Sequence, residues 1–181
     1  MRRSWRPAVV VAISILVVGV VAAGSVQASS PNTVTAVNQF SVQVNKSLNV
    51  QLRFAPGTLH IQHGATLTFR EGPPIPPFTG PVEPHTLSIL RPGQVPTTLR
   101  QIFFCPACGP ILAAHDPNND EQPPFVYRIN KGGPGLNAPG DSLLVDSTHP
   151  VITAKVTAPA GTTLRFICVI HPWMQGKLVV N

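Results

Sequence analysis

Residues 163–180 read TLRFICVIHPWMQGKLVV, and no other stretch of the chain carries as much information. Leu164, Phe166 and Cys168 fall on one face of a predicted β-strand, because side chains alternate sides with a period of two residues. If the leucine and the phenylalanine face a core, the thiol faces it as well, at the end of the strand. A turn follows, and the alternation at 178–180 predicts a returning strand.

The turn after this strand offers three different metal donors. Cys168, His171 and Met174 supply a thiolate, an imidazole and a thioether at the spacing Cys-x-x-His-x-x-Met. Copper(I) prefers sulfur, whereas copper(II) accepts imidazole, so a mixed set suits an ion that cycles between both states. A second imidazole comes from His85, which lies on the same face of a predicted strand as Leu87. The sequence therefore predicts one copper ion held by these four residues.

Each of these residues also has a purely structural interpretation. Cys168 and Met174 would then be ordinary core residues with His171 on an exposed loop. His85 would be a hydrogen-bonded core histidine. The cysteine count favours the metal, since an oxidising compartment pairs its thiols and this chain has three, with Cys105 and Cys108 as the other two.

The N-terminus predicts export. Arg2, Arg3 and Arg6 precede an apolar run, and Val26-Gln27-Ala28 has the small residues of a signal-peptidase site. Residues 1–28 are expected to be a signal peptide, with an uncleaved membrane anchor as the alternative. The segment holds three of the arginines behind the formal net charge of +6. The remaining basic residues are scattered, which predicts no nucleic-acid partner.

The rest of the chain predicts one all-β domain. Residues 29–37 are expected to be a polar lead-in, and 38–181 a single sandwich. Alternation of apolar and polar residues, which predicts strands with one face buried, recurs at 40–44, 48–52, 59–61, 67–69, 87–89, 152–156, 164–166 and 178–180. Residues 91–140, rich in proline and glycine, are expected to be a long loop insertion between the two halves of the sandwich.

The residues around the predicted ligands resemble the plastocyanin/amicyanin family of cupredoxins. The segment 168–174, followed by Gly176 and an apolar strand, is similar to the copper loop of that family, and its short spacing is nearest to amicyanin. Residues 54–69 and 84–87 resemble the first half of the same fold. The resemblance implies a cupredoxin-like Greek-key β-sandwich with one type 1 copper. Thr86 stands where many members have an asparagine that braces the two ligand loops.

Several other residues invite a metal interpretation. His60, His63, His115 and His149 are expected to be solvated surface residues. The pair Cys105-Pro-Ala-Cys108 has three interpretations: a local disulfide, a second metal site with His115, or a thioredoxin-like dithiol. The disulfide is favoured, because the chain offers no α/β setting and few further ligands.

The family resemblance implies a surface for redox partners. The edge of His171 is expected to emerge through an apolar patch that includes Pro172 and Trp173, with Pro74, Pro76, Pro77 and Phe78 at its rim. The predicted function is single-electron transfer by a monomeric, exported copper protein that is not an enzyme. The alternative is a copper-binding and delivery protein of the same fold. A multicopper enzyme is disfavoured, because further closely spaced histidines are missing.

Overall fold

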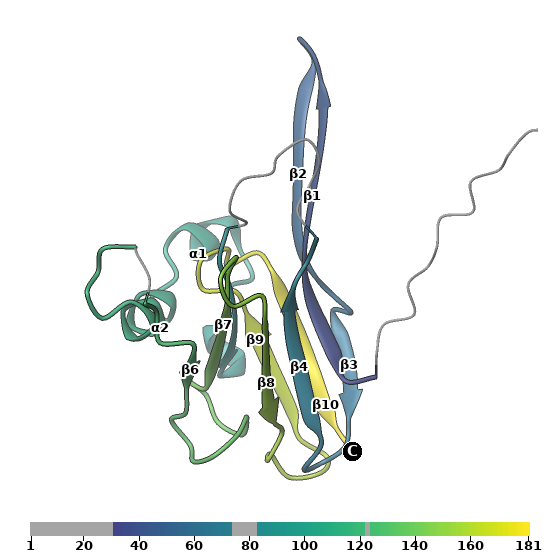
Figure 1. Cartoon of the computed structure of the whole chain (residues 1–181), viewed down its shortest axis with the longest axis vertical. Coiled ribbons are helices and arrows are strands. Elements are labelled where there is room, and N and C mark those ends of the chain that lie inside the picture. Colours follow the sequence, from purple (N-terminus) through teal and green to yellow (C-terminus); the bar gives the residue numbers. More distant parts are fainter. Residues whose placement is uncertain (1–30, 74–82, 122–123) are drawn as a thin grey trace, which may run out of the picture.

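Two β-sheets pack face to face and form the body of the molecule (Figure 1). The computed structural model describes residues 31–73, 83–121 and 124–181. The expected signal peptide lies outside these residues. Among the residues described, no helix is long and apolar enough to span a bilayer.

The first sheet has the strand order β2-β1-β4-β8 and the second has the order β3-β10-β9-β5-β7-β6. The first consists of β1 (Thr33–Gln43), β2 (Ser47–Ala55), β4 (Thr66–Glu71) and β8 (Val151–Lys155). The second consists of β3 (Thr58–Ile61), β5 (His85–Leu90), β6 (Arg128–Ile129), β7 (Ser142–Val145), β9 (Thr163–Ile167) and β10 (Gln175–Val180). The chain passes from one sheet to the other repeatedly, which confirms the predicted all-β sandwich.

The core lies between the inner faces of the two sheets. Phe69 and Phe166 are fully buried, and Phe54 packs edge to face against both rings. Gly176 lies opposite Phe166 in the β9–β10 pair, and a Cβ atom at this position would lie 2.4 Å from that ring. The close approach explains why a glycine follows the predicted ligand loop.

Residues 91–140 are more structured than the expected loop. They contain η1 (Pro92–Gln94), α1 (Leu99–Phe103), α2 (Cys108–His115) and the short strand β6. Cys108 packs with Leu90, Ile167 and Val169 in a second buried cluster. This segment therefore covers the outer face of β9, so that β9 is buried on both faces where it reaches the predicted ligand loop.

The β1–β2 hairpin departs from the prediction in two ways. β1 begins at Thr33, inside the segment expected to be a polar lead-in. Residues 39–51, which we call the ribbon, extend beyond the end of the sandwich (Figure 1) and are exposed throughout. The strands predicted here exist, but the expectation that one face would be buried is wrong, because the second sheet stops before it can cover the ribbon.

Candidate metal centre

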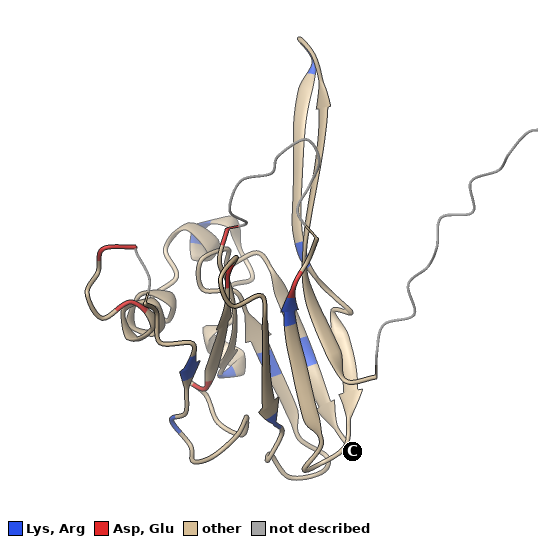
Figure 2. Cartoon of the chain, in the orientation of Figure 1, with Lys and Arg blue, Asp and Glu red and all other residues tan. Residues whose placement is uncertain are grey.

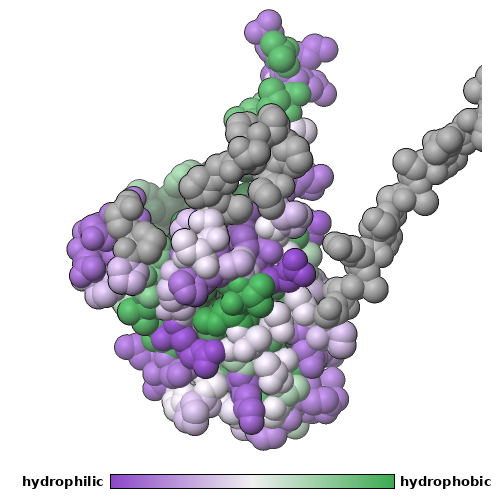
Figure 3. All heavy atoms as spheres, viewed as in Figure 1, coloured by the Kyte–Doolittle hydropathy of each residue, from purple (hydrophilic) through white to green (hydrophobic). Residues whose placement is uncertain are grey.

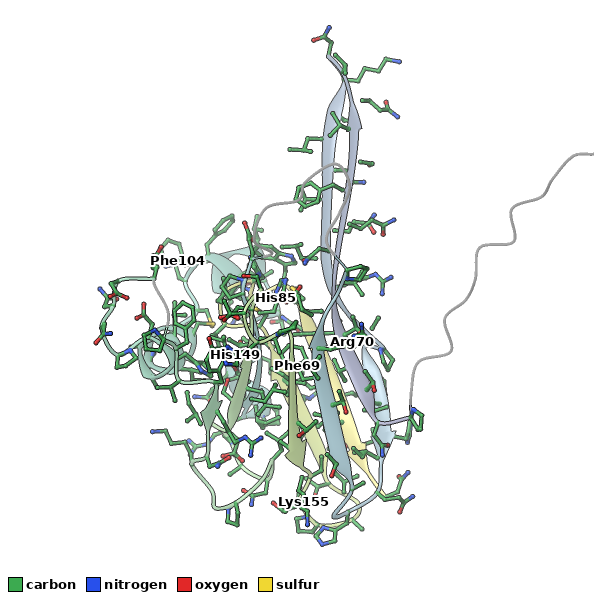
Figure 4. All side chains as sticks on the ribbon, viewed as in Figure 1. Phe69, Arg70, His85, Phe104, His149 and Lys155 are labelled. Atoms are coloured by element: carbon green, nitrogen blue, oxygen red, sulfur yellow. A yellow bond between two sulfur atoms is a disulfide. The ribbon has the colours of Figure 1, made fainter. Side chains whose placement is uncertain are left out.

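The structure brings three of the four predicted ligands together at one end of the sandwich. His85 is the first residue of β5, whereas Cys168 and His171 lie in the loop between β9 and β10. The Sγ atom of Cys168 lies 3.8 Å from Nδ1 of His85 and 3.7 Å from Nδ1 of His171. The two Nδ1 atoms are 3.2 Å apart. Figure 4 labels His85 at this end of the sheets.

The spacing of these three atoms fits a transition-metal ion. A point equidistant from them lies about 2.1 Å from each, close to the usual metal–nitrogen bond length of about 2.0–2.1 Å. All three side chains are buried. Among the described residues, they form a group whose possible ligand atoms all lie within 4.8 Å of one another. The donor set of two imidazoles and one thiol is that of a blue-copper site.

Hydrogen bonds on the far side of each imidazole prepare Nδ1 as a ligand. Nε2 of His85 donates to Oδ1 of Asn38 at 2.9 Å, and Nε2 of His171 donates to the Glu83 carboxylate at 3.0 Å. Because the hydrogen of each neutral ring sits on Nε2, the lone pair of Nδ1 is free and points into the cluster. The tautomer that a metal requires is therefore set by neighbouring side chains.

Burial keeps the cluster uncharged in the absence of a metal. Burial and the nearby His171 lower the pKa of His85 to about 3. Burial also lowers the pKa of His171, although Glu83 opposes this shift. The pKa of the Cys168 thiol is raised by burial, and hydrogen bonds from Thr86 and the loop backbone oppose the rise. At neutral pH both imidazoles are available as ligands, and the thiol must lose its proton to become one.

Met174 lies in the same core cluster as Cys168 and is 1% exposed. Its backbone is tied to the other ligands, since Cys168 N–H donates to the Met174 carbonyl at 3.0 Å and Met174 N–H donates to the His171 carbonyl at 2.8 Å. These bonds close the loop tightly around the cluster. The thioether is thus placed among the core residues next to the predicted site.

Thr86 takes the bracing position predicted for it. Its hydroxyl accepts a hydrogen bond from Val169 N–H at 2.9 Å, and its own N–H points to the Cys168 sulfur at 3.4 Å. Both bonds join β5 to the loop after β9. The side chain therefore links the two segments that carry the ligands, as an asparagine does in the family that the sequence resembles.

The other histidines and cysteines differ from one another in their surroundings. His60, His63 and His149 are exposed, in line with the prediction. His115 is fully buried, so the expectation of a surface residue is wrong. Helix α2 turns its ring inward, where it contacts the Val126 carbonyl and the Ser142 hydroxyl. No simple pattern in the sequence signals this, because the two partners lie 11 and 27 residues further along the chain.

Cys105 and Cys108 form a disulfide. Cys168 is the free cysteine and is buried. The pairing corresponds to the first of the three interpretations that the sequence left open, and it leaves one thiol for the cluster.

The predicted docking residues are not equally accessible. Trp173 is 51% exposed, and its ring centroid lies 5.2 Å from that of His171. Pro172 is buried, so it offers little surface to a partner. Residues 74–82, predicted to form the rim, lie outside the described residues.

Comparisons with known proteins concern the fold. No family model matches the sequence, and no curated protein matches it. Among solved structures, auracyanin A of Chloroflexus aurantiacus, described as a blue copper protein, is 22% identical, with 71% of this chain and 89% of that chain covered and a TM-score of 0.40. Plastocyanin of Dryopteris crassirhizoma is 17% identical, with coverages of 72% and 90% and a TM-score of 0.37. Amicyanin of Paracoccus versutus is 12% identical, with coverages of 84% and 83% and a TM-score of 0.36. The strand order of the two sheets, with a His-Cys-His cluster at their end, confirms the predicted cupredoxin-like β-sandwich.

Proposed function

We propose that this protein is an exported type 1 copper protein that transfers single electrons between redox partners. The observation that carries the proposal is the meeting of two Nδ1 atoms and one thiol sulfur, all buried, at metal-binding distances. His85, Cys168 and His171 would hold the copper, with Met174 as a weak further ligand. The bound ion would supply the one-electron redox change.

The protein would hold the ligands rigidly and let a redox partner approach the copper. His85 begins a strand and Cys168 directly follows one, so the ligands cannot move far when the oxidation state changes. His171 lies near the surface beside Trp173, which favours an exit for the electron through this imidazole. A partner would approach over Trp173, and no catalytic group is needed for this function.

The burial of the site supports electron transfer over copper delivery. Copper delivery would require the ion to leave its site readily. Cys168 is fully buried and Met174 is 1% exposed, and Thr86 braces the two ligand segments against each other. The disulfide and the single remaining thiol support an oxidising, exported setting.

The test is the visible spectrum of the mature domain with copper(II). The wild-type protein should bind one equivalent and turn blue or blue-green, because charge transfer from thiolate to copper gives an intense band. The variant Cys168→Ser should lose this band completely while its circular dichroism stays that of a folded β-sandwich.

The matched control removes the other two cysteine sulfur atoms. A double variant, Cys105→Ser with Cys108→Ser, should keep the band, since these residues are joined to each other and do not belong to the group of His85, Cys168 and His171. A colourless wild-type protein, or a band that survives in Cys168→Ser, would refute the proposed site.

A further inference from the structure

A cleft of about 440 Å³ lies between helix α2 and the loop that follows β9. Its apolar lining comes from Leu112 of α2, Phe125, Leu144 of β7 and Ile170 of the loop. The volume is within the range of about 300–1,000 Å³ that is typical of small-molecule sites. Segment 91–140 thus forms one wall of a ligand-sized cleft, and the loop with the predicted metal ligands forms another.

The charged side chains that line the cleft are acidic. Glu83, Asp116 and Glu121 line it, and no lysine or arginine of the described residues does. Figure 2 shows acidic residues in the loop that follows α2. The histidines of the lining, His115 and His171, are buried, and burial lowers the pKa of each ring, so neither brings a positive charge at neutral pH. Such a lining is complementary to an organic cation, whose charge meets carboxylates while its apolar part leaves water.

The cleft does not offer the donor set of a second transition-metal ion. Both ring nitrogens of His115 are engaged, since Nδ1 donates to the Val126 carbonyl and Nε2 lies 2.7 Å from the Ser142 hydroxyl. Nε2 of His171 donates to the Glu83 carboxylate at 3.0 Å, and Nδ1 of the same ring belongs to the cluster already described. Without a nitrogen or sulfur ligand from the described lining, the cleft favours a cation that carboxylates attract without such ligands.

We propose that this cleft binds a small organic cation with an apolar body, such as an amidinium or ammonium group on an aromatic ring. Phe125 adds to the attraction, because the face of an aromatic ring attracts cations. The bound cation lies beside Glu83, whose carboxylate accepts a hydrogen bond from His171. A positive charge there favours copper(I) over copper(II) and raises the reduction potential. This effect on the potential rests on the proposed function, whereas the binding itself does not.

The test titrates the copper-free protein, with its disulfide intact, with three matched probes and follows the amide resonances by NMR. Benzamidinium, benzamide and benzoate share one ring with a planar substituent and differ in charge. Benzamidinium should shift the resonances of α2 and of the loop after β9, with a Kd on the order of 1 mM, as for a fragment of this size. Benzamide should bind about tenfold more weakly, and benzoate should show no saturable binding, because the carboxylates of the cleft repel it.

A substitution in the lining shows that the binding belongs to this cleft. Leu112 is 39% exposed, so Leu112→Lys should fold normally, and the added cation should abolish the binding of benzamidinium. Leu99→Lys adds the same charge at a position of α1 outside the lining that is 69% exposed, and this matched control should bind as the wild type does. Glu121→Gln should weaken binding about threefold. Equal binding of benzamide and benzamidinium, no saturable binding of either, or normal binding by Leu112→Lys would overturn the inference.

Voltammetry of the copper-loaded protein tests the effect on the potential. Benzamidinium should bind the reduced protein about threefold more tightly than the oxidised one, which corresponds to a rise of about 30 mV at saturation. Benzamide should leave the potential unchanged. A potential that stays constant or falls at saturating benzamidinium would overturn the effect on the copper. A protein that binds benzamidinium but never turns blue would refute the proposed function alone, and a blue protein that does not bind benzamidinium would refute this inference alone.

Discussion

The carboxyl group of Glu71 lies on the Nε2 side of the His85 ring, 3.7 Å from that nitrogen. Asn38 joins it to the site, since its Nδ2 donates to Glu71 Oε1 at 2.9 Å while its Oδ1 accepts from His85. The other carboxyl oxygen, Oε2, is buried without a partner among the described residues. Burial raises the pKa of Glu71 to about 8, against the opposing bond from Asn38. The group is therefore neutral at pH 7 and orients the His85 ring without adding a charge.

The raised pKa of Glu71 makes the copper-free protein less stable as pH rises. The folded state holds a proton on Glu71 up to about pH 8, whereas an unfolded glutamate loses it near pH 4.5. Stability from this proton is fully present below pH 4.5 and is lost as pH rises toward 8. Glu71→Gln should remove this dependence and raise the free energy of unfolding at pH 8 by on the order of 1–3 kcal/mol.

Urea unfolding of the copper-free protein at several pH values measures this effect. Glu121→Gln is the matched control, because Glu121 is an exposed glutamate that makes no hydrogen bond or ion pair with His85 or His171, and the variant should keep the pH dependence of the wild type. A Glu71→Gln protein that is as pH-dependent as the wild type would show that Glu71 ionises normally.

At the scale of elements, the sequence predicts best where a local pattern and the final packing agree. The alternation of side chains predicted that Cys168, directly after β9, faces the core, and Cys168 is fully buried. The same alternation predicted that one face of the ribbon would be buried. Burial depends on an opposing sheet, which a local pattern cannot reveal. The helices of 91–140 and the ring of His115 were missed for a related reason. Their packing depends on contacts with β7 and β9 that are distant in sequence.

The ribbon has one apolar and one polar face. Val42 lies opposite Leu48 in the β1–β2 pair, and these side chains are 60% and 64% exposed. Hydrophobic residues are visible along this part of the surface in Figure 3. Because β2 is also an edge strand of its sheet, this element is prone to association with other apolar surfaces.

The exposure of the ribbon predicts tolerance to polar substitution. The double variant Val42→Thr with Leu48→Thr keeps good strand formers and should change the free energy of unfolding by less than about 0.5 kcal/mol, as for surface substitutions. It should also lower binding of a hydrophobic dye. Val34→Thr on the same strand, at a fully buried position, is the contrasting control and should be clearly destabilising. A large loss of stability in the ribbon variant would mean that these side chains pack within the domain.

At the scale of the whole molecule, the site exists only in the folded chain. His85 and Cys168 are separated by 83 residues and come from neighbouring strands of the second sheet, β5 and β9. Lys and Arg residues are spread along the sheets and hairpins (Figure 2), so the charges visible there do not form a basic patch. Metal binding is therefore coupled to the packing of the sandwich, and an ion bound to the folded state will stabilise the entire domain.

The charge state of the cluster predicts how copper binding depends on pH. The pKa of His171 is lowered from 6.5 and that of the Cys168 thiol is raised from 9.0, so between these pH values both imidazoles are neutral and the thiol is protonated. Binding must then expel the thiol proton, and affinity should rise about tenfold for each unit of pH. Calorimetric titration of the copper-free protein in buffers of different ionisation enthalpy should report the release of about one proton per copper. Cys168→Ser should release none, because a serine hydroxyl stays protonated. Release of two protons from the wild type would show that a buried imidazole is charged, and no release would show that the thiolate is already formed before copper arrives.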